Sequence, residues 1–248
     1  MIDTHCHLDV AAFDRDRAEV LARAVAAGVT GILVPAIRHR PNAIDHRLIR
    51  IALGIHPQIV PELTAGERAL DAEHLASEAI AAGACAIGEC GLDGATGERE
   101  LQDALFRVQI RAARIARLPL VVHVLRAHDV APQILREESA HEVGGVLHSY
   151  SGGAELVATY ARLGFAFSFA GPVTYPNARK PIEAARAVPA DLLLAETDAP
   201  DQAPVAHCGG RSEPAFVADV IAGLAAARGD DAAALCLANA RRIFSAWV

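Results

Sequence analysis

Short apolar runs alternate with longer segments of helical periodicity along the whole chain. Eight of these runs are rich in aliphatic and β-branched residues, which is typical of strands buried in a parallel sheet. They cover residues 2–6, 29–37, 51–56, 85–90, 120–125, 145–148, 165–170 and 192–196. Between them, apolar residues at three- and four-residue spacing predict helices over 14–27, 41–49, 66–82, 98–117, 128–138, 152–163 and 178–187, and a final pair from 213.

The alternation predicts an α/β fold, a (β/α)8 TIM barrel that forms a single domain over residues 1–248. A doubly wound open sheet is the alternative with the same order of elements. The two folds differ in where reactive residues lie. A barrel collects them from the ends of many strands, and an open sheet from the one point where the strand order reverses. Polar residues end many of the predicted strands, which favours the barrel.

Candidate metal ligands stand at or just after the ends of five predicted strands. They are His5, His7, Glu89, His123, His148 and Asp198. His5 and His7 point to the same face, because side chains alternate along a strand. A carboxylate at an apolar strand end, such as Glu89, is costly unless it is paired or binds a cation. Each residue alone fits a hydrogen-bonded structural role, but the six together indicate a metal centre.

Four imidazoles and two carboxylates are more ligands than one tetrahedral ion needs, so the sequence predicts two divalent cations per chain. Glu89 lies on the strand between the two halves of this ligand set and is the natural bridge. Such a pair of cations activates a water molecule and stabilises developing charge. The set leaves the metal open among Zn, Mn, Mg, Co and Ni, and no other cofactor is predicted.

The chain resembles the TatD family of metal-dependent hydrolases, a branch of the amidohydrolase-like superfamily, along its whole length. The similarity is carried by IDTHCHLD at 2–9, LGIHP at 53–57, GECGLD at 88–93, the strand at 119–123, HSYSG at 148–152, ETDAP at 196–200, RSEP at 211–214, and Asn239 with 243–244. No single motif is decisive. Their order and spacing together are highly specific.

The resemblance implies how the six ligands are divided and used. His5, His7, Glu89 and Asp198 would hold one metal, and Glu89, His123 and His148 the second. Asp198 would act as general base toward a metal-bound water, which makes Asp198 and Glu89 the implied catalytic residues. The typical family activity is metal-dependent deoxyribonuclease, often a 3′-to-5′ exonuclease. Aminoacyl-tRNA deacylation and simple ester hydrolysis are also associated with the family.

Several positions depart from the family pattern. Gln58 follows His56 and Pro57, where the family often has a second histidine. The arginine after the fifth strand, Arg126, is displaced by one residue, and Ser149 with the next residue stands where Cys-Phe is usual. These departures concern the substrate more than the metals.

Four residues near the predicted strand ends are candidates for substrate binding. His56 and Arg126 follow strands three and five, on the predicted rim of the site, where each can hold a phosphate or carboxylate. Tyr150 and Tyr175, in the loops after strands six and seven, are candidates for stacking on a base. Solvated loop residues are the alternative. Asp93 is expected to orient a histidine ligand or to cap the next helix.

Charge and composition restrict the partners. Lys and Arg number 23 against 30 for Asp and Glu, and the formal charge of −7 opposes non-specific binding of nucleic acid. A stripe of arginines at 107, 111, 114 and 117 is expected on the solvated outer face of a helix. No apolar run is long enough for a membrane helix and no secretory signal is evident, so we expect a cytoplasmic protein without an obligate protein partner.

Three functions follow, in order of preference. The first is a binuclear-metal deoxyribonuclease acting on single-stranded or frayed DNA ends. The second is a carboxyl-ester or amide hydrolase, such as an aminoacyl-tRNA deacylase, which uses the same metal-activated water on a carbonyl carbon. The third is a non-catalytic metal-binding protein, which a complete ligand set with a candidate base disfavours.

Overall fold

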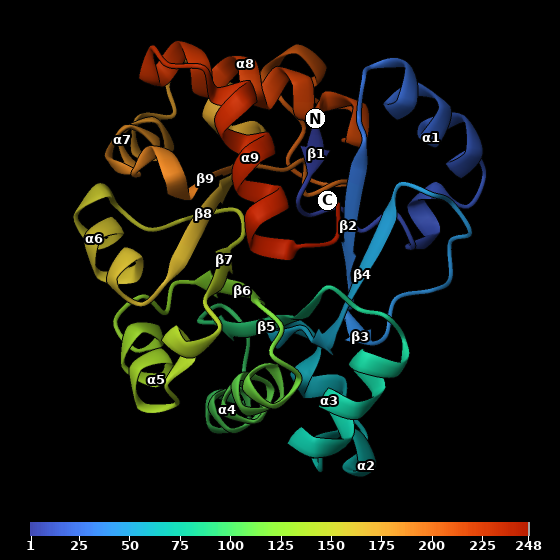
Figure 1. Ribbon diagram of the computed structural model, residues 1–248, viewed down its shortest axis with the longest axis vertical. Coiled ribbons are helices and arrows are strands. Elements are labelled where there is room, and N and C mark those ends of the chain that lie inside the picture. Colours follow the sequence, from blue (N-terminus) through green and yellow to red (C-terminus); the bar gives the residue numbers. More distant parts are fainter. Residues whose placement is uncertain (248) are drawn as a thin grey trace.

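Eight parallel strands lie side by side in a ring, in the computed structural model that describes residues 1–247 (Figure 1). In chain order they are β1 (Ile2–Asp3), β2 (Gly31–Pro35), β4 (Ile49–Ile55), β5 (Ala86–Asp93), β6 (Leu120–Leu125), β7 (Gly145–Leu147), β8 (Phe165–Phe169) and β9 (Leu193–Ala195). Each pairs with the next, as the sequence predicts for a (β/α)8 barrel. A short strand, β3 (Arg38–His39), pairs antiparallel with β4 and was not predicted.

The ring closes between its first and last strands through individual hydrogen bonds. The amide of Thr4 donates to the carbonyl of Ala195 at 3.3 Å, and the amide of Asp198 to that of His5 at 2.9 Å. The amide of His7 donates to the carbonyl of Ala199 at 2.8 Å. This closure holds the segment after β1 against the segment after β9. It therefore fixes two histidines beside Asp198.

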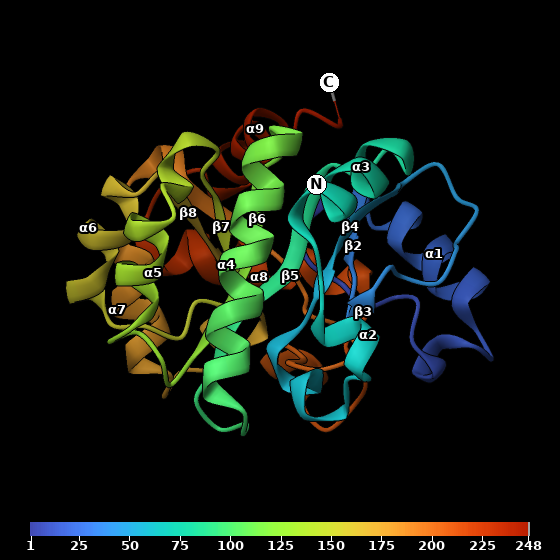
Figure 2. The same ribbon diagram turned by 90° about the horizontal axis from the view of Figure 1, so that it is seen from below.

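Helices surround the ring, and Figure 2 shows α4 running along its outside. They are α1 (Arg17–Ala26), α2 (Ala65–Arg68), α3 (Ala72–Ala81), α4 (Arg99–Ala116), α5 (Ala131–Glu137), α6 (Ala154–Arg162), α7 (Arg179–Ala187), α8 (Val217–Arg228) and α9 (Ala232–Phe244). No helix within residues 1–247 is long and apolar enough to cross a membrane.

Two predicted helices were wrong in detail. The segment 41–49 is not helical, because its backbone is bound by Asp9, whose Oδ2 accepts the amide of Asn42 at 2.9 Å. The segment 66–82 contains two helices. Thr64 forms a capping box that starts α2, and Asp71 caps α3 by accepting the amide of His74.

The strands separate two apolar layers. Inward-facing residues near the amino ends of the strands, including Ile2, Leu33 and Leu194, pack with Ala240 and Phe244 of α9. Helix α9 therefore closes the barrel end opposite the carboxyl ends of the strands, and it crosses the ring in Figure 1. The outward-facing residues join the layer under the surrounding helices. They include the three phenylalanines of β8, as predicted: Phe165, Phe167 and Phe169.

The side chain of Asn239 ties α9 to the start of β9. Its Nδ2 donates to the carbonyls of Ala190 and Leu193, each at 2.9 Å. We expect Asn239→Ala to lower the free energy of unfolding by about 1–3 kcal/mol, because both carbonyls lose a partner. Urea denaturation measures this loss. Asn177→Ala, at an exposed loop position, is the matched control, and equal losses in the two variants would contradict the assignment.

Candidate metal centre

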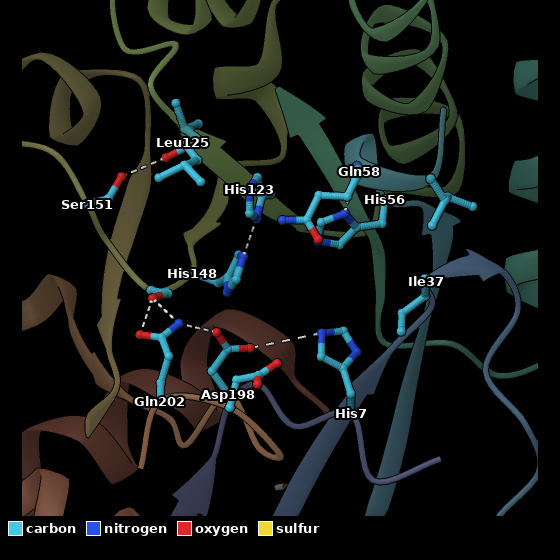
Figure 3. Close-up of a pocket in the computed structure, with 14 residues that line it drawn as sticks. His7, Ile37, His56, Gln58, His123, Leu125, His148, Ser151, Asp198 and Gln202 are labelled. Atoms are coloured by element: carbon cyan, nitrogen blue, oxygen red, sulfur yellow. Dashed lines mark hydrogen bonds and ion pairs between the residues drawn. The ribbon is translucent and has the colours of Figure 1, made fainter. Parts of the chain in front are cut away.

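All six predicted ligands meet at the carboxyl end of the barrel. Figure 3 shows the four that line the cavity there, which are His7, His123, His148 and Asp198. His5 and His7 directly follow β1, Glu89 and His123 lie within β5 and β6, and His148 directly follows β7. Asp198 comes three residues after β9. The ring of strands brings these residues together from positions up to 193 apart in the sequence, which explains why no short motif contains them.

Glu89 lies at the centre of the cluster, and its two oxygens face different histidines. Its Oε2 is 3.1 Å from Nε2 of His5 and 3.4 Å from Nε2 of His7. Its Oε1 is 3.0 Å from Nδ1 of His123 and 2.6 Å from Nε2 of His148. The side chain is fully buried. A carboxylate in this position can bridge two cations, one held by each pair of imidazoles.

Asp198 belongs to the first of these two groups. Its Oδ1 is 3.6 Å from Nε2 of His5 and 3.9 Å from Nε2 of His7. Its side chain is 12% exposed and also lines the cavity above the cluster. A group that contacts both the ligands and the cavity is placed to exchange a proton with a molecule bound there.

The chemistry of the cluster fits metal binding. The ring nitrogens of His5 and His7 approach to 3.2 Å, and those of His123 and His148 to 3.0 Å. A proton shared within either pair satisfies that contact but cannot also be donated to Glu89, which lies between the pairs. The buried Oε2 of Glu89 has no hydrogen-bond partner. His5, His7, Glu89 and Asp198 would hold one cation, and Glu89, His123 and His148 the other.

Burial and the central carboxylate act in opposite directions on the imidazoles. Burial, together with the neighbouring His148, lowers the pKa of His5 to about 4. Burial also opposes the charge of His148, but Glu89 and Glu196 outweigh it and hold its pKa well above the usual value. The pKa values of His7 and His123 are raised too, because contacts with carboxylates exceed the cost of burial. Burial disfavours the charge of Glu89, yet the histidines hold its pKa well below normal.

Two carboxylates lie near the ring nitrogens of His123 and His148 that do not face Glu89. Asp93 Oδ2 lies 3.5 Å from Nε2 of His123, which is the orienting role expected for this residue. Helix α4 has Glu98 at its N-cap, so Asp93 does not cap it. Glu196 Oε1 lies 3.5 Å from Nδ1 of His148 and was not predicted in this role. Carboxylates behind ligating histidines fix the ring orientation and raise the basicity of the ligand.

His56 lies deeper than the rim on which it was predicted. Its Nε2 is 2.8 Å from Oε1 of Glu89, and its side chain is only 9% exposed. The reason is local: Nδ1 of His56 accepts the amide of Gln58 at 3.0 Å, which turns the other ring nitrogen toward the cluster. Burial lowers the pKa of His56, so the neutral ring carries its proton on Nε2 and donates it to Glu89. Contact with substrate stays a prediction for this residue.

The other predicted substrate ligands do not line the cavity above the cluster. Its volume is about 460 Å³, and Gln58, Ser149, Asp201 and Gln202 are among the polar residues around it. Arg126 is exposed outside it. Tyr150 is buried, and its hydroxyl donates to the carbonyl of Gly153 at 2.9 Å. Tyr175 donates to the carbonyl of Ala203 at 3.1 Å and lines other cavities.

Sequence reasoning did not find Gln202. It lines the cavity, and its side-chain amide donates a hydrogen bond to Asp198 (Figure 3). A glutamine four residues after a candidate base is no recognisable signal by itself. Its role becomes visible only in the structure, where the turn after Asp198 returns the side chain of Gln202 to that carboxylate.

Metal binding should release protons. The raised pKa values of His7, His123 and His148 favour their charged forms, whereas a metal requires neutral imidazoles. Affinity for Zn should therefore fall with pH below neutrality, about tenfold per pH unit for each proton displaced. Calorimetry in buffers of different ionisation heat counts these protons. His148→Ala should reduce the count, and His141→Ala, exposed and remote, should not. Heats that do not depend on the buffer would contradict this account.

Known proteins resemble this chain over its whole length. The TatD related DNase family model matches residues 2–245. The uncharacterized metal-dependent hydrolase YabD of Bacillus subtilis (strain 168) is 36% identical over 255 residues, with 98% of each chain covered. The crystal structure of YjjV, a TatD homologue from Escherichia coli K12, matches with a TM-score of 0.87 at 30% identity, covering 99% of this chain and 98% of that one. The chain therefore belongs to the TatD family of metal-dependent hydrolases.

Proposed function

We propose that this protein is a binuclear-metal deoxyribonuclease that removes nucleotides from the 3′ ends of single-stranded or frayed DNA. The division of Glu89 between two pairs of imidazoles is the observation that carries this proposal. Two cations held by these two groups of residues would suit the in-line displacement at a phosphodiester, because each would stabilise one of the two oxygens involved. The description of the matched family model, TatD related DNase, supports the same activity.

The residues of the chain divide the chemical work. The bound cations would supply an activated water and stabilise the charge that develops on the phosphate. Asp198, whose carboxylate faces the cavity, would serve as the proton acceptor for a water activated there. Glu89 keeps the two ligand groups at a fixed separation. His148 and His123 are held in orientation by Glu196 and Asp93, at 3.5 Å in both cases.

A DNA end would be bound by a few residues beside the metal centre and not by an extended basic surface. Three of the four arginines of the predicted stripe are paired with acidic residues: Arg107 with Glu137 at 2.9 Å, Arg111 with Glu138 at 2.7 Å and Arg114 with Glu142 at 2.8 Å. They form no free basic track. Lys180, the only lysine of the chain, instead lines a second cavity of about 200 Å³ that shares Ser149 and Gln202 with the first. This cavity offers a positive charge to a phosphate near the metal centre.

Hydrolysis of a carboxyl ester or amide is the second candidate. The second cavity has mainly apolar walls, which include Phe169, Pro172 and Pro181. An acyl chain or an aminoacyl group would fit such walls as well as a nucleotide does. The net charge of −7 is also less unfavourable for a small neutral ester than for a long strand of DNA.

Asp198→Asn tests the proposed base. We expect the metal-loaded variant to lose at least about 100-fold in cleavage of a 5′-labelled single-stranded oligonucleotide, because no carboxylate takes the proton from water. The wild type should give a metal-dependent ladder that shortens from the 3′ end. Asp45→Asn changes an exposed carboxylate that does not line the cavity and should keep the activity.

Two outcomes would overturn the proposal. Full activity of Asp198→Asn would show that Asp198 is not the base. A metal-loaded wild type that leaves DNA intact but hydrolyses carboxyl esters or aminoacyl-tRNA would replace the nuclease with the second candidate.

A further inference from the structure

We propose that Ser149 and Gln202 form a clamp that positions the carboxylate of Asp198 for metal binding and for its proposed role as base. Neither residue would touch the reacting atoms, so both are positioning residues. The catalytic part of this inference rests on the proposed function. The part that concerns metal affinity does not.

The first half of the clamp is the contact between Gln202 and Asp198. Nε2 of Gln202 donates to Oδ2 of Asp198, while Oδ1 of the same carboxylate lies 3.9 Å from Nε2 of His7 (Figure 3). The same Oδ1 lies 3.6 Å from Nε2 of His5. A carboxylate only accepts hydrogen bonds, so the amide nitrogen of Gln202, and not its oxygen, must face Asp198. The two oxygens of Asp198 therefore have separate partners, and the plane of the carboxylate is fixed.

The second half of the clamp is Ser149, which binds the side-chain amide group of Gln202. Its hydroxyl donates to Oε1 of Gln202 at 2.9 Å, and the same hydroxyl lies 2.7 Å from Nε2. The backbone amide of Ser149 donates to Oε1 of Glu196 at 2.5 Å. Glu196 in turn lies behind His148. Ser149 thus contacts both Glu196, which orients His148, and Gln202, which orients Asp198.

The backbone at these positions is unusual for residues other than glycine. Ser149, Asp198 and Gln202 all have positive φ, at 39°, 52° and 51°. The amide of Asp201 donates to the carbonyl of Asp198 at 3.0 Å, which closes a turn and returns Gln202 to the base. Left-handed conformations of such residues cost free energy and persist where the surrounding contacts enforce them. The clamp is a contact of this kind.

Without the clamp, Asp198 would be free to rotate. Its side chain borders a cavity and is 12% exposed, so few packed atoms restrict the carboxylate. Rotation would exchange its oxygens and move the ligand away from His5 and His7. Loss of a partner that orients a metal ligand typically costs 10–100-fold in metal affinity or activity. The same range is expected here.

The experiment uses the full-length protein and removes each half of the clamp. Gln202→Met keeps the length of the side chain without its donors, and Ser149→Ala removes only the hydroxyl. Gln133→Met is the matched control, because it makes the same substitution at an exposed position of α5 that does not line the cavity. Zn affinity is measured by competition with a chelator, and kcat and KM with the single-stranded oligonucleotide. Melting temperatures of the metal-free proteins report folding.

We expect Gln202→Met to weaken one of the two Zn sites 10–100-fold and to lower kcat in the same range, with KM within about twofold. The control should match the wild type. Ser149→Ala should have a smaller effect of the same kind. In the double variant its effect should disappear, because Ser149 acts on Asp198 through Gln202.

The proposal is overturned if Gln202→Met binds both Zn ions like the control, or if the effects of the two substitutions add. A wild type that binds Zn but does not cleave DNA refutes the proposed function alone, and the Zn affinities still decide on the clamp. If Gln202→Met fails to fold, Ser149→Ala decides. Zn binding at the wild-type level in that variant would overturn the clamp.

Discussion

The fully buried carboxylate of Glu89 is the constraint on which the rest of the site depends. Removing a carboxylate from water is costly unless it is paired or binds a cation. Four ligand imidazoles and His56 gather around it, and its two oxygens divide them into two groups. Their closest nitrogens lie 3.0–3.2 Å from one another, where one proton can be shared within each pair, yet the buried Oε2 of Glu89 has no hydrogen-bond partner. The cluster therefore fits cation binding, and Glu89 lies between its two groups of histidines.

Two features of the barrel produce this arrangement. Its first and last strands are joined into a ring, and helix α9 covers the amino ends of the strands. Individual hydrogen bonds join the segments after β1 and β9, which sets His5 and His7 against Asp198. Helix α9 packs under the strands, so the inward-facing layer at the amino ends is filled with apolar side chains. The polar residues are consequently confined to the other end. This separation of stability from chemistry is typical of (β/α)8 barrels.

Periodicity predicts the order of elements well, because buried strands and amphipathic helices follow from local patterns of apolar residues. All eight barrel strands lie near their predicted positions, and strand-end positions predict that the six ligands meet. The sequence-based predictions fail where contacts between residues outside the local pattern determine the backbone conformation or the orientation of a side chain. Asp9 holds the segment 41–49 in a non-helical form, and the bond from the amide of Gln58 turns His56 inward. Gln202 is invisible in the sequence, because only the turn after Asp198 gives it a role.

The central claim is that Glu89 bridges two cations. Crystals of the wild type grown with Mn or Zn, measured by anomalous diffraction at the metal edge, test it most directly. The account predicts two anomalous peaks, one beside Oε2 of Glu89 with His5, His7 and Asp198, and one beside Oε1 with His123 and His148. A single peak that Glu89 does not contact, or none within the cluster at saturating metal, would contradict it.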